Sequence, residues 1–478
     1  MRGSLFSLQP PRCSLEMSVG TQFGEDAWLG GTEEVIAALA WVGQGELEGK
    51  RVDPTVKNNE AVRLAAENGH LEVMQALLAW VGQGELEGRR VDPTGGDNQA
   101  VRLAAENGHL GVVQALLAWE GQGTLEGKHV DPTGGDNQAV VWAAETCRLG
   151  VVQALLAWVG QGELEGKRVD PTMHNSDTVF SAAENNHLEV VRALLAWVGQ
   201  GTLEGKRVDP TVYNNYAVRR AAENGYLKVV QELLAWVGQG TLEGKRVDPT
   251  EEDLNYAIRG AAEIGHLEVV QELLAWVGQG TLEGRRVDPT AEDNAAVRNA
   301  ARGGYVDVLQ ALLDWVGEGE LEGKRVDPTV HASKPLREAT RNGHLEVVQA
   351  LLAWVGQGTL EGKRVDPTGG DNLTLWWAVK HGHVEVVFAL CDWVGQGSLE
   401  GKRVDVEAVH RRALSTVTPP TTLAVLKQGA VARAEWRPTR VAWITAVVLG
   451  GFARQAAAAA ASHADGVLRK RQCVVVEG

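Results

Sequence analysis

The sequence predicts an all-α solenoid made of tandem repeats. The chain has 478 residues, and ten of its 16 tryptophans recur every 39 residues, with a single step of 40. They are Trp41, Trp80, Trp119, Trp158, Trp197, Trp236, Trp276, Trp315, Trp354 and Trp393. The phrase LLAWVGQG recurs around most of them. A fixed period of roughly 20 to 50 residues indicates stacked repeats, where length alone would have suggested several globular domains.

The first helix of each repeat is short and has a narrow apolar face. In the copy at 98–133, Ala104 and Ala105 lie on an apolar face at helical spacing and permit close helix approach. Asn98 stands where an N-cap is expected, since its side-chain oxygen can accept from the amides of the first turn. Gly108 is expected to end this helix, because glycine adopts a left-handed C-cap conformation at little steric cost.

The second helix begins at Leu110 and carries a wider apolar stripe, which predicts burial on more than one side. Two helices this short cannot hide their apolar faces alone, so neighbouring repeats must stack on them. After Trp119, the glycines of EGQGTLEG oppose further helix, and the following VDPT indicates a strand end that enters a turn. We therefore expect a β-turn or hairpin loop between repeats.

These residues resemble the AAxxGHLxVVxxLL pattern of ankyrin repeats. The matching residues are Ala104-Ala105, Gly108-His109-Leu110, Val112-Val113 and Leu116-Leu117. The family's TPLH motif is degraded, and its closest form is Lys334-Pro335-Leu336-Arg337, so the hydrogen bonds that this motif makes between repeats need a substitute. The period also exceeds the family's roughly 33 residues. The resemblance implies a helix-turn-helix solenoid with an extended loop after each second helix.

Four segments are expected along the chain. Residues 27–405 form the solenoid, with one partial and nine full repeats, and residues 1–26 precede it as a disordered segment. Residues 406–440 are expected to be a degenerate capping repeat, and 441–478 an apolar, Ala-rich basic tail. The uninterrupted apolar part of this tail is shorter than the roughly 20 residues that span a bilayer. Its interpretations are a buried or partner-bound helix, a low-complexity tail, and a weak membrane anchor.

The charge of the chain is uneven. The net charge is −16, but residues 406–478 carry 10 Lys and Arg against 4 Asp and Glu, which leaves −22 on the rest. An acidic array repels phosphate backbones, so we expect no nucleic acid and a protein partner with a basic surface. The four cysteines are far apart and form no CxxC motif. We therefore expect an intracellular, cytoplasmic protein, and a monomer.

No motif in the sequence predicts catalysis, a cofactor or a metal site. The recurring GQGELEGK phrase misses the spacing of a phosphate-binding loop and follows a helix where such a loop precedes one. The histidines recur once per repeat at the turn between the helices, so they form no ligand pair, and we expect them to cap and bridge that turn. The GGDN turns offer too few carboxylates for calcium. We expect a protein that is not an enzyme.

Variation among the repeats is confined to the residues after VDPT and the start of the first helix. In ankyrin-repeat proteins this strip corresponds to the loop tips and the concave face that hold partners, so the resemblance implies a binding site there. Aromatic and arginine side chains dominate interaction hot spots. The candidate partner-binding residues are Trp142, Phe180, Tyr213, Tyr216, Arg219, Arg220, Tyr256, Arg259, Trp376 and Trp377. Drift on an exposed loop is the alternative explanation.

The predicted function is that of a protein-binding scaffold. The alternatives are a membrane-tethered ankyrin adaptor held by the C-terminal apolar segment, an adaptor subunit of an enzyme complex, and duplicated repeats without a selected partner. The tryptophan row also has two interpretations: each indole packs beneath its own loop against the next repeat's second helix, or the row is an exposed binding strip.

Overall fold

Each second helix buries one stripe of apolar residues. Its sequence, LEVVQALLA at 345–353 and similar in the other copies, places two adjacent apolar residues and a leucine at helical spacing, as Val190, Val191 and Leu194 show in one copy, where all three are fully buried. The computed structural model describes residues 32–42, 51–250 and 255–409. Within those residues it confirms the predicted helix-pair repeats, joined by hairpin loops.

Two compact blocks make up the chain, and each is described by itself. Block 1 comprises residues 1–221 and 228–247, and block 2 comprises residues 222–227 and 248–478. The helices of the first block and of the boundary are α2 (Thr32–Ala40), α3 (Val56–Asn68), α4 (Leu71–Ala79), α5 (Gly95–Asn107), α6 (Leu110–Leu117), α7 (Gly134–Glu145), α8 (Leu149–Ala157), α9 (Met173–Glu184), α10 (Leu188–Ala196), α11 (Val212–Glu223) and α12 (Leu227–Ala235). Those of block 2 are α13 (Tyr256–Ile264), α14 (Leu267–Ala275), α15 (Ala291–Gly303), α16 (Val306–Asp314), α17 (Val330–Asn342), α18 (Leu345–Ala353), α19 (Gly369–His381) and α20 (Val384–Asp392).

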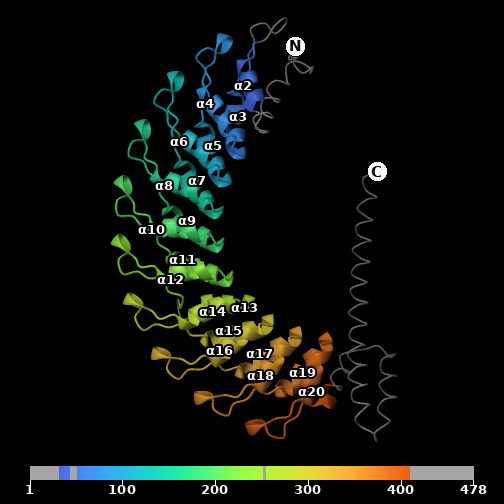
Figure 1. Cartoon of the computed structure of the whole chain (residues 1–478). Helices are drawn as coiled ribbons and strands as arrows, with labels where there is room; N and C mark the ends of the chain where they lie inside the picture. Colours follow the sequence, from blue (N-terminus) through green and yellow to red (C-terminus); the bar gives the residue numbers. More distant parts are fainter. Residues whose placement is uncertain (1–31, 43–50, 251–254, 410–478) are drawn as a thin grey trace, which may run out of the picture. The chain divides into compact units, whose positions relative to one another are not determined.

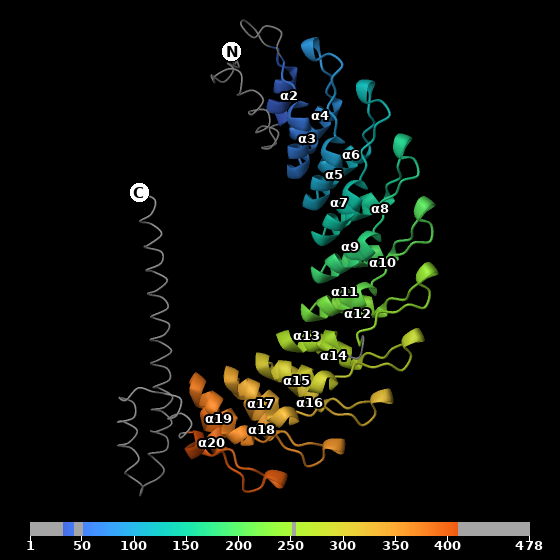
Figure 2. The same ribbon diagram turned by 180° about the vertical axis from the view of Figure 1, so that it is seen from behind.

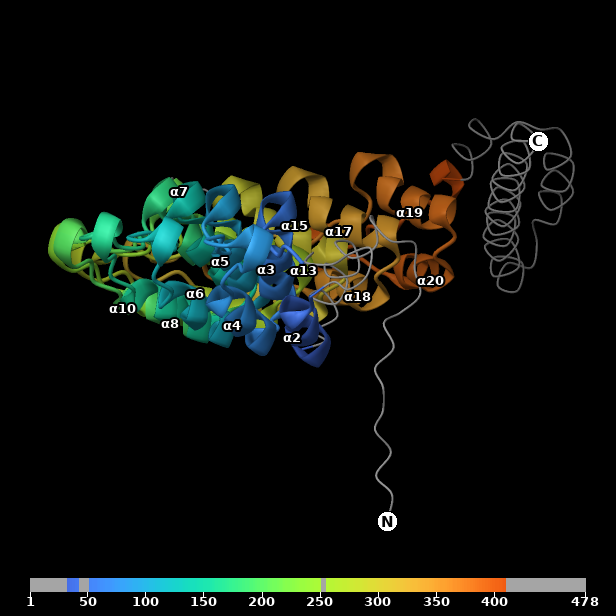
Figure 3. The same cartoon turned by 90° about the horizontal axis from the view of Figure 1, so that it is seen from above.

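Within each block, first helices pack on first helices and second helices on second helices. In block 1, α3, α5, α7 and α9 contact one another in sequence, and in block 2, α13, α15, α17 and α19 do so. Figure 3 shows α15, α17 and α19 in one layer and α18 and α20 in the other. Paired alanines at the first-helix contacts, such as Ala104 and Ala105, are fully buried. The prediction that narrow, alanine-lined first helices stack closely is thus confirmed.

A hairpin follows each second helix and projects to one side of its block (Figures 1 and 2). In most repeats an isolated antiparallel bridge closes it, as between Val277 and Arg286. The tip is one turn of 3-10 helix, for example Gly280–Leu282. Left-handed backbone at Gly280 and Gly284 permits this tight turn. The tips are η2 (Gly84–Leu86), η3 (Gly123–Leu125), η4 (Gly162–Leu164), η5 (Gly201–Leu203), η6 (Gly240–Leu242), η7 (Gly280–Leu282), η8 (Gly319–Leu321), η9 (Gly358–Leu360) and η10 (Gly397–Leu399).

The ten recurring tryptophans are all half-buried at the base of the hairpins. Trp315 lines a shallow cavity of about 330 Å³ with Leu274, Ala275 and Val287 of the preceding repeat. Trp354 lines a similar cavity with the preceding repeat's second helix. The expectation that each indole faces the next repeat is therefore wrong in direction at these two positions.

The first helices begin with an unexpected left-handed turn. In six of the described repeats, three consecutive residues have left-handed backbone angles, as at Glu292, Asp293 and Asn294 with φ of 53°, 55° and 59°. The turn at 331–333, also in block 2, follows the same course. Right-handed helix starts only after this turn.

The N-cap role predicted for Asn98 is wrong. Asn98 has a φ of 58°, and its side-chain oxygen accepts from the backbone N–H of Asp131 in the next repeat at 2.8 Å, while the first turn of its own helix has no side-chain cap. The same bond recurs in both blocks with Asn or Ser as acceptor. The acceptors are Asn59, Asn98, Asn137, Ser176, Asn255, Asn294, Ser333 and Asn372. This bond links neighbouring repeats in place of the degraded TPLH motif.

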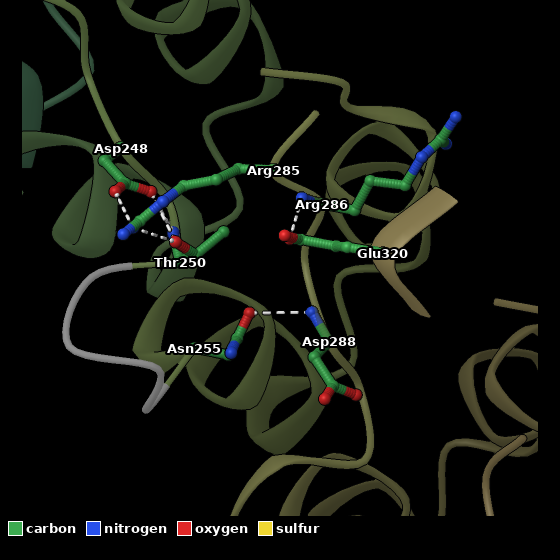
Figure 4. Close-up of polar contacts among 7 residues, drawn as sticks. All are labelled: Asp248, Thr250, Asn255, Arg285, Arg286, Asp288 and Glu320. Atoms are coloured by element: carbon green, nitrogen blue, oxygen red, sulfur yellow. Dashed lines mark hydrogen bonds and ion pairs between the residues drawn. The ribbon is translucent and has the colours of Figure 1, made fainter. Parts of the chain in front are cut away.

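A second ladder joins the hairpins of neighbouring repeats. Asp131 accepts from the backbone and hydroxyl of Thr133 in its own turn, at 2.9 and 2.6 Å, and forms an ion pair with Lys167 of the next repeat at 2.9 Å. Figure 4 shows both ladders in block 2, where Arg285 pairs with Asp248 and Asn255 accepts from the Asp288 backbone. Every VDPT segment therefore stabilises its own turn and links that turn to the following repeat.

The inter-helix histidines also bridge repeats. Nε2 of His109 donates to the backbone oxygen of Glu67 in the preceding repeat at 2.9 Å, and three other histidines make the equivalent bond. No side-chain cap is formed at His109, so the predicted bridging occurs and the predicted capping does not. Gly108 has the left-handed C-cap conformation expected for it, with φ of 82°.

Three of the predicted segments fall wholly or mostly outside the described residues. These are the N-terminal segment 1–26, the greater part of the capping repeat 406–440, and the tail 441–478. Residues 406–409 are helical. Among the described helices, none combines the length and the apolar character that a bilayer span requires.

Candidate functional site

One face of each first helix is partly exposed. In α3 the buried positions are Ala61, Val62, Ala65 and Ala66. The residues at 60, 63, 64 and 67 lie on the opposite side, because positions three and four apart share a helix face. We call these four positions, and their equivalents in the other repeats, the first-helix face. Together with the left-handed turns it holds the residues that vary between repeats.

The structure brings five of the ten candidate residues into one cluster. Phe180 of α9 makes edge-to-face contacts with Tyr213 and Tyr216 of α11, with ring centroids 6.2 and 5.5 Å apart. Arg219 and Arg220 lie 5.9 and 6.0 Å from the Tyr216 ring centroid. Edge-to-face geometry suits the aromatic quadrupole, and a cation over a ring is attracted by the same charge distribution. The cluster therefore spans two neighbouring repeats of block 1.

An ion pair fixes one edge of this cluster. Nη2 of Arg220 lies 2.5 Å and Nε 2.8 Å from one carboxylate oxygen of Glu184, which belongs to the preceding repeat. Tyr213 lies in the left-handed turn at the start of α11, and its hydroxyl donates to the backbone oxygen of His174 at 3.3 Å. Tyr213 is still half exposed. The cluster thus presents an ordered aromatic surface to solvent.

The other candidates belong to other repeats. Trp142 of α7 has Arg102 of the preceding repeat 6.0 Å from its ring centroid. In block 2, Arg259 lies 5.0 Å from the ring centroid of Tyr256 on the same helix, α13. Trp376 is half-buried on α19, next to Trp377. These ring contacts are thus local to one repeat or to two neighbouring repeats.

Trp377 lies among cations that the sequence reasoning missed. Arg341 of α17 is 5.1 Å and Lys380 of α19 is 4.7 Å from its ring centroid. The His381 ring stacks on it at 5.5 Å and continues to His383 at 6.0 Å. An alignment of the repeats with one another would have marked Arg341 and Lys380, because their position is glutamate in the earlier copies.

Burial lowers the pKa of the His381 imidazole below its ordinary value, and the positive charges of His383, Lys380 and Arg341 lower it further. These cations therefore act on one another as well as on the ring. In the described part of the chain, no group of three or more His, Cys, Asp or Glu side chains is arranged to hold a metal ion.

The described residues form an array of helix-pair repeats whose first helices each have a partly exposed face. Residues 254–360 match the family model for ankyrin repeats, in three copies, which correspond to the repeats of α13 to α18. Residues 254–360 of the chain are therefore ankyrin repeats. Comparison with curated proteins gives no match. Ankyrin repeats generally mediate protein–protein interaction, and the family is typically not enzymatic.

Proposed function

We propose that this chain is a non-catalytic scaffold that binds another protein through its first-helix faces and left-handed turns. One observation carries the proposal: the side chains that differ between repeats lie on this exposed surface, while the constant residues hold the stack together. Buried alanines, inter-repeat asparagines and the Asp–Lys ladder recur with little change. A surface free to vary on a constant frame is suited to encode recognition.

The cluster around Phe180 is the best anchor in block 1. Its rings are already held by edge-to-face contacts and by the Arg220–Glu184 ion pair, so a partner would lose little side-chain entropy on binding there. Tyrosine and arginine combine large contact area with polar groups, which is why they dominate hot spots. We propose that Phe180, Tyr213, Tyr216, Arg219 and Arg220 contact the partner together.

The proposal also includes the charge of the partner, the intracellular setting and the monomeric state that the sequence predicts. The exposed glutamates of the first-helix face in block 1, such as Glu67 and Glu145, favour a partner with basic groups near them. Cys147 is an exposed thiol, which suits the intracellular setting expected from the sequence. A monomer is proposed as the binding form, and light scattering after size exclusion tests it.

Affinity capture with quantitative mass spectrometry tests the function. We expect Arg219→Glu to reduce the recovery of specific partners severalfold, because it places a negative charge beside Tyr216 on the proposed surface. Lys228→Glu is the matched control: it makes the same charge change on the exposed start of α12, outside the first-helix face. Equal recovery by the chain and both variants, with unchanged melting temperatures, would contradict the proposal.

A further inference from the structure

The sign of the charge changes along one position of the first-helix face. The residue that follows the paired small residues of the first helix is acidic in six full repeats and basic in the last three. The acidic ones are Glu67, Glu106, Glu145, Glu184, Glu223 and Glu263. The basic ones are Arg302, Arg341 and Lys380, on α15, α17 and α19 of block 2. The net charge of −16 conceals this local reversal.

All three cations are exposed, and they differ in whether a carboxylate neutralises them. Arg302 forms an ion pair with Glu263 of the preceding repeat at 2.6 Å, and both side chains are about half exposed. Within the described residues, neither Arg341 nor Lys380 forms an ion pair with a carboxylate; both instead lie over the Trp377 ring. Cations that lack a carboxylate partner and are already held over an aromatic ring are positioned to bind an anion.

We propose that the first-helix face of α15, α17 and α19 binds an acidic segment of the partner protein, with its carboxylates on Arg302, Arg341 and Lys380. This inference rests on the proposed function and specifies the chemistry of the partner at one end of block 2. It also differs from the charge expected of the partner in block 1, where the same position is glutamate.

The surroundings favour a protein segment over nucleic acid. The carboxylate of Glu338 lies on the same face of α17 as Arg341, three residues before it. Duplex DNA presents about one charge per 1.7 Å, and its binding depends on neutralising many phosphates at once. A short acidic peptide needs only a few cations, and it can place a neutral residue opposite Glu338.

The stacking of the helices suggests a spacing for the acidic residues. α15 packs on α17 and α17 on α19. Packed helices lie about 8–10 Å apart, and a segment in the polyproline II conformation turns once every three residues and advances about 3.1 Å per residue. Every third residue of such a segment therefore returns to the same side about 9 Å further on and meets a new helix. We expect the site to prefer glutamates at every third position.

Fluorescence anisotropy with labelled synthetic peptides and the full chain tests the proposal. One peptide of about 12 residues has glutamate at every third position, a second has the same composition with the glutamates contiguous, and a third has lysine for glutamate. We expect the first to bind most tightly and the third not to bind. The double variant Arg341→Glu with Lys380→Glu should raise the Kd of the first peptide by about tenfold or more, because two attractions become repulsions.

Two control variants make the result interpretable. Glu106→Lys with Glu145→Lys changes the same helix position in block 1 and should leave that Kd less affected than the block 2 variant, or strengthen binding. Arg341→Lys with Lys380→Arg keeps the charges and should retain binding. An unchanged Kd in the folded charge-reversal variant, or tighter binding of a single-stranded oligonucleotide of equal charge at the same cations, would overturn the proposal.

An NMR titration of His381 provides a readout that folding alone would not move. A carboxylate bound to Arg341 and Lys380 would offset their charges, so the pKa of His381 should rise when the first peptide is added. No rise at saturating peptide would contradict binding at this position. If peptide binding fails while partner capture still depends on Arg219, this inference falls and the proposed function stands; if both fail, both fall.

Discussion

The side-chain oxygen of Asn98 accepts a hydrogen bond from the backbone N–H of Asp131, 2.8 Å away and 33 residues further along the chain. The equivalent bond recurs through both blocks. A small polar side chain in a left-handed turn therefore links neighbouring repeats in place of the degraded TPLH motif. Asparagine suits this task because it tolerates the left-handed conformation better than most residues and carries an acceptor close to the backbone.

We therefore expect Asn98→Ala to destabilise the array by about 1–3 kcal/mol, since it leaves a partly buried N–H without its acceptor and adds strain to the turn. Urea unfolding and hydrogen exchange at the Asp131 amide measure the loss. Asn98→Ser is the matched control, because Ser176 and Ser333 make this bond in their own repeats at 3.3 and 3.2 Å. Equal effects of alanine and serine on exchange at Asp131 would contradict the linking role.

The sequence predicted the helix pairs, the glycine C-cap and the hairpins, because each depends on residues close together in the chain. The role of Asn98 escaped prediction because its partner lies a whole repeat away. The left-handed turns escaped it because Glu292 or Tyr213 gives no local sign of that conformation, whereas Gly96 does. Site residues were sought after VDPT and at the start of the first helix, so Trp377 was found and the cations Arg341 and Lys380, in the last turns of their helices, were missed.

The left-handed turns store strain wherever they lack glycine. Glu292 has φ of 53° and ψ of 48°, a conformation that costs a residue with a side chain roughly 1–2 kcal/mol. Gly96 and Gly135 occupy the same position in other repeats. We expect Glu292→Gly to raise the melting temperature and Glu292→Ala, which keeps the strain, not to do so. A melting temperature that rises equally in both variants would point to lost charge repulsion instead.

Acid should weaken the array through the Asp–Lys ladder. Burial alone would raise the pKa of Asp131, but hydrogen bonds from Thr133 and Lys167 and the charge of Lys167 outweigh it and hold the pKa below its ordinary value. Asp92 and Asp170 behave in the same way. Because the folded-state pKa is depressed, the stabilisation is fully present above the unfolded-state pKa of about 4. It is lost as the pH falls through the folded-state pKa.

We therefore expect the urea midpoint to fall between about pH 5 and about pH 3. Replacing Lys128, Lys167 and Lys206 by methionine removes three partners, each half exposed and worth about 0.2–1 kcal/mol. The triple variant should be less stable at neutral pH and should lose less on acidification. A parallel decrease in the chain and the variant would assign the acid sensitivity to other groups.

The half-buried tryptophans should stabilise the hairpin bases. Trp197→Ala is expected to lower stability by about 1–3 kcal/mol, less than for a fully buried aromatic residue, and to leave partner capture unchanged at temperatures where the variant is folded. Thermal melting and capture are measured on the same preparation. Unchanged stability with lost capture would identify the tryptophan row as the binding strip.

Site-specific photo-crosslinking tests the central claim most directly, because it reports which surface touches a partner. A photoreactive amino acid is placed at Tyr213 or Tyr256, in the variable surface, or at Val198, in a hairpin, three positions that are 50%, 40% and 42% exposed. Crosslinked partner is expected from Tyr213 or Tyr256 and not from Val198. Crosslinks from Val198 alone, or equally from all three, would contradict binding through the first-helix faces and left-handed turns.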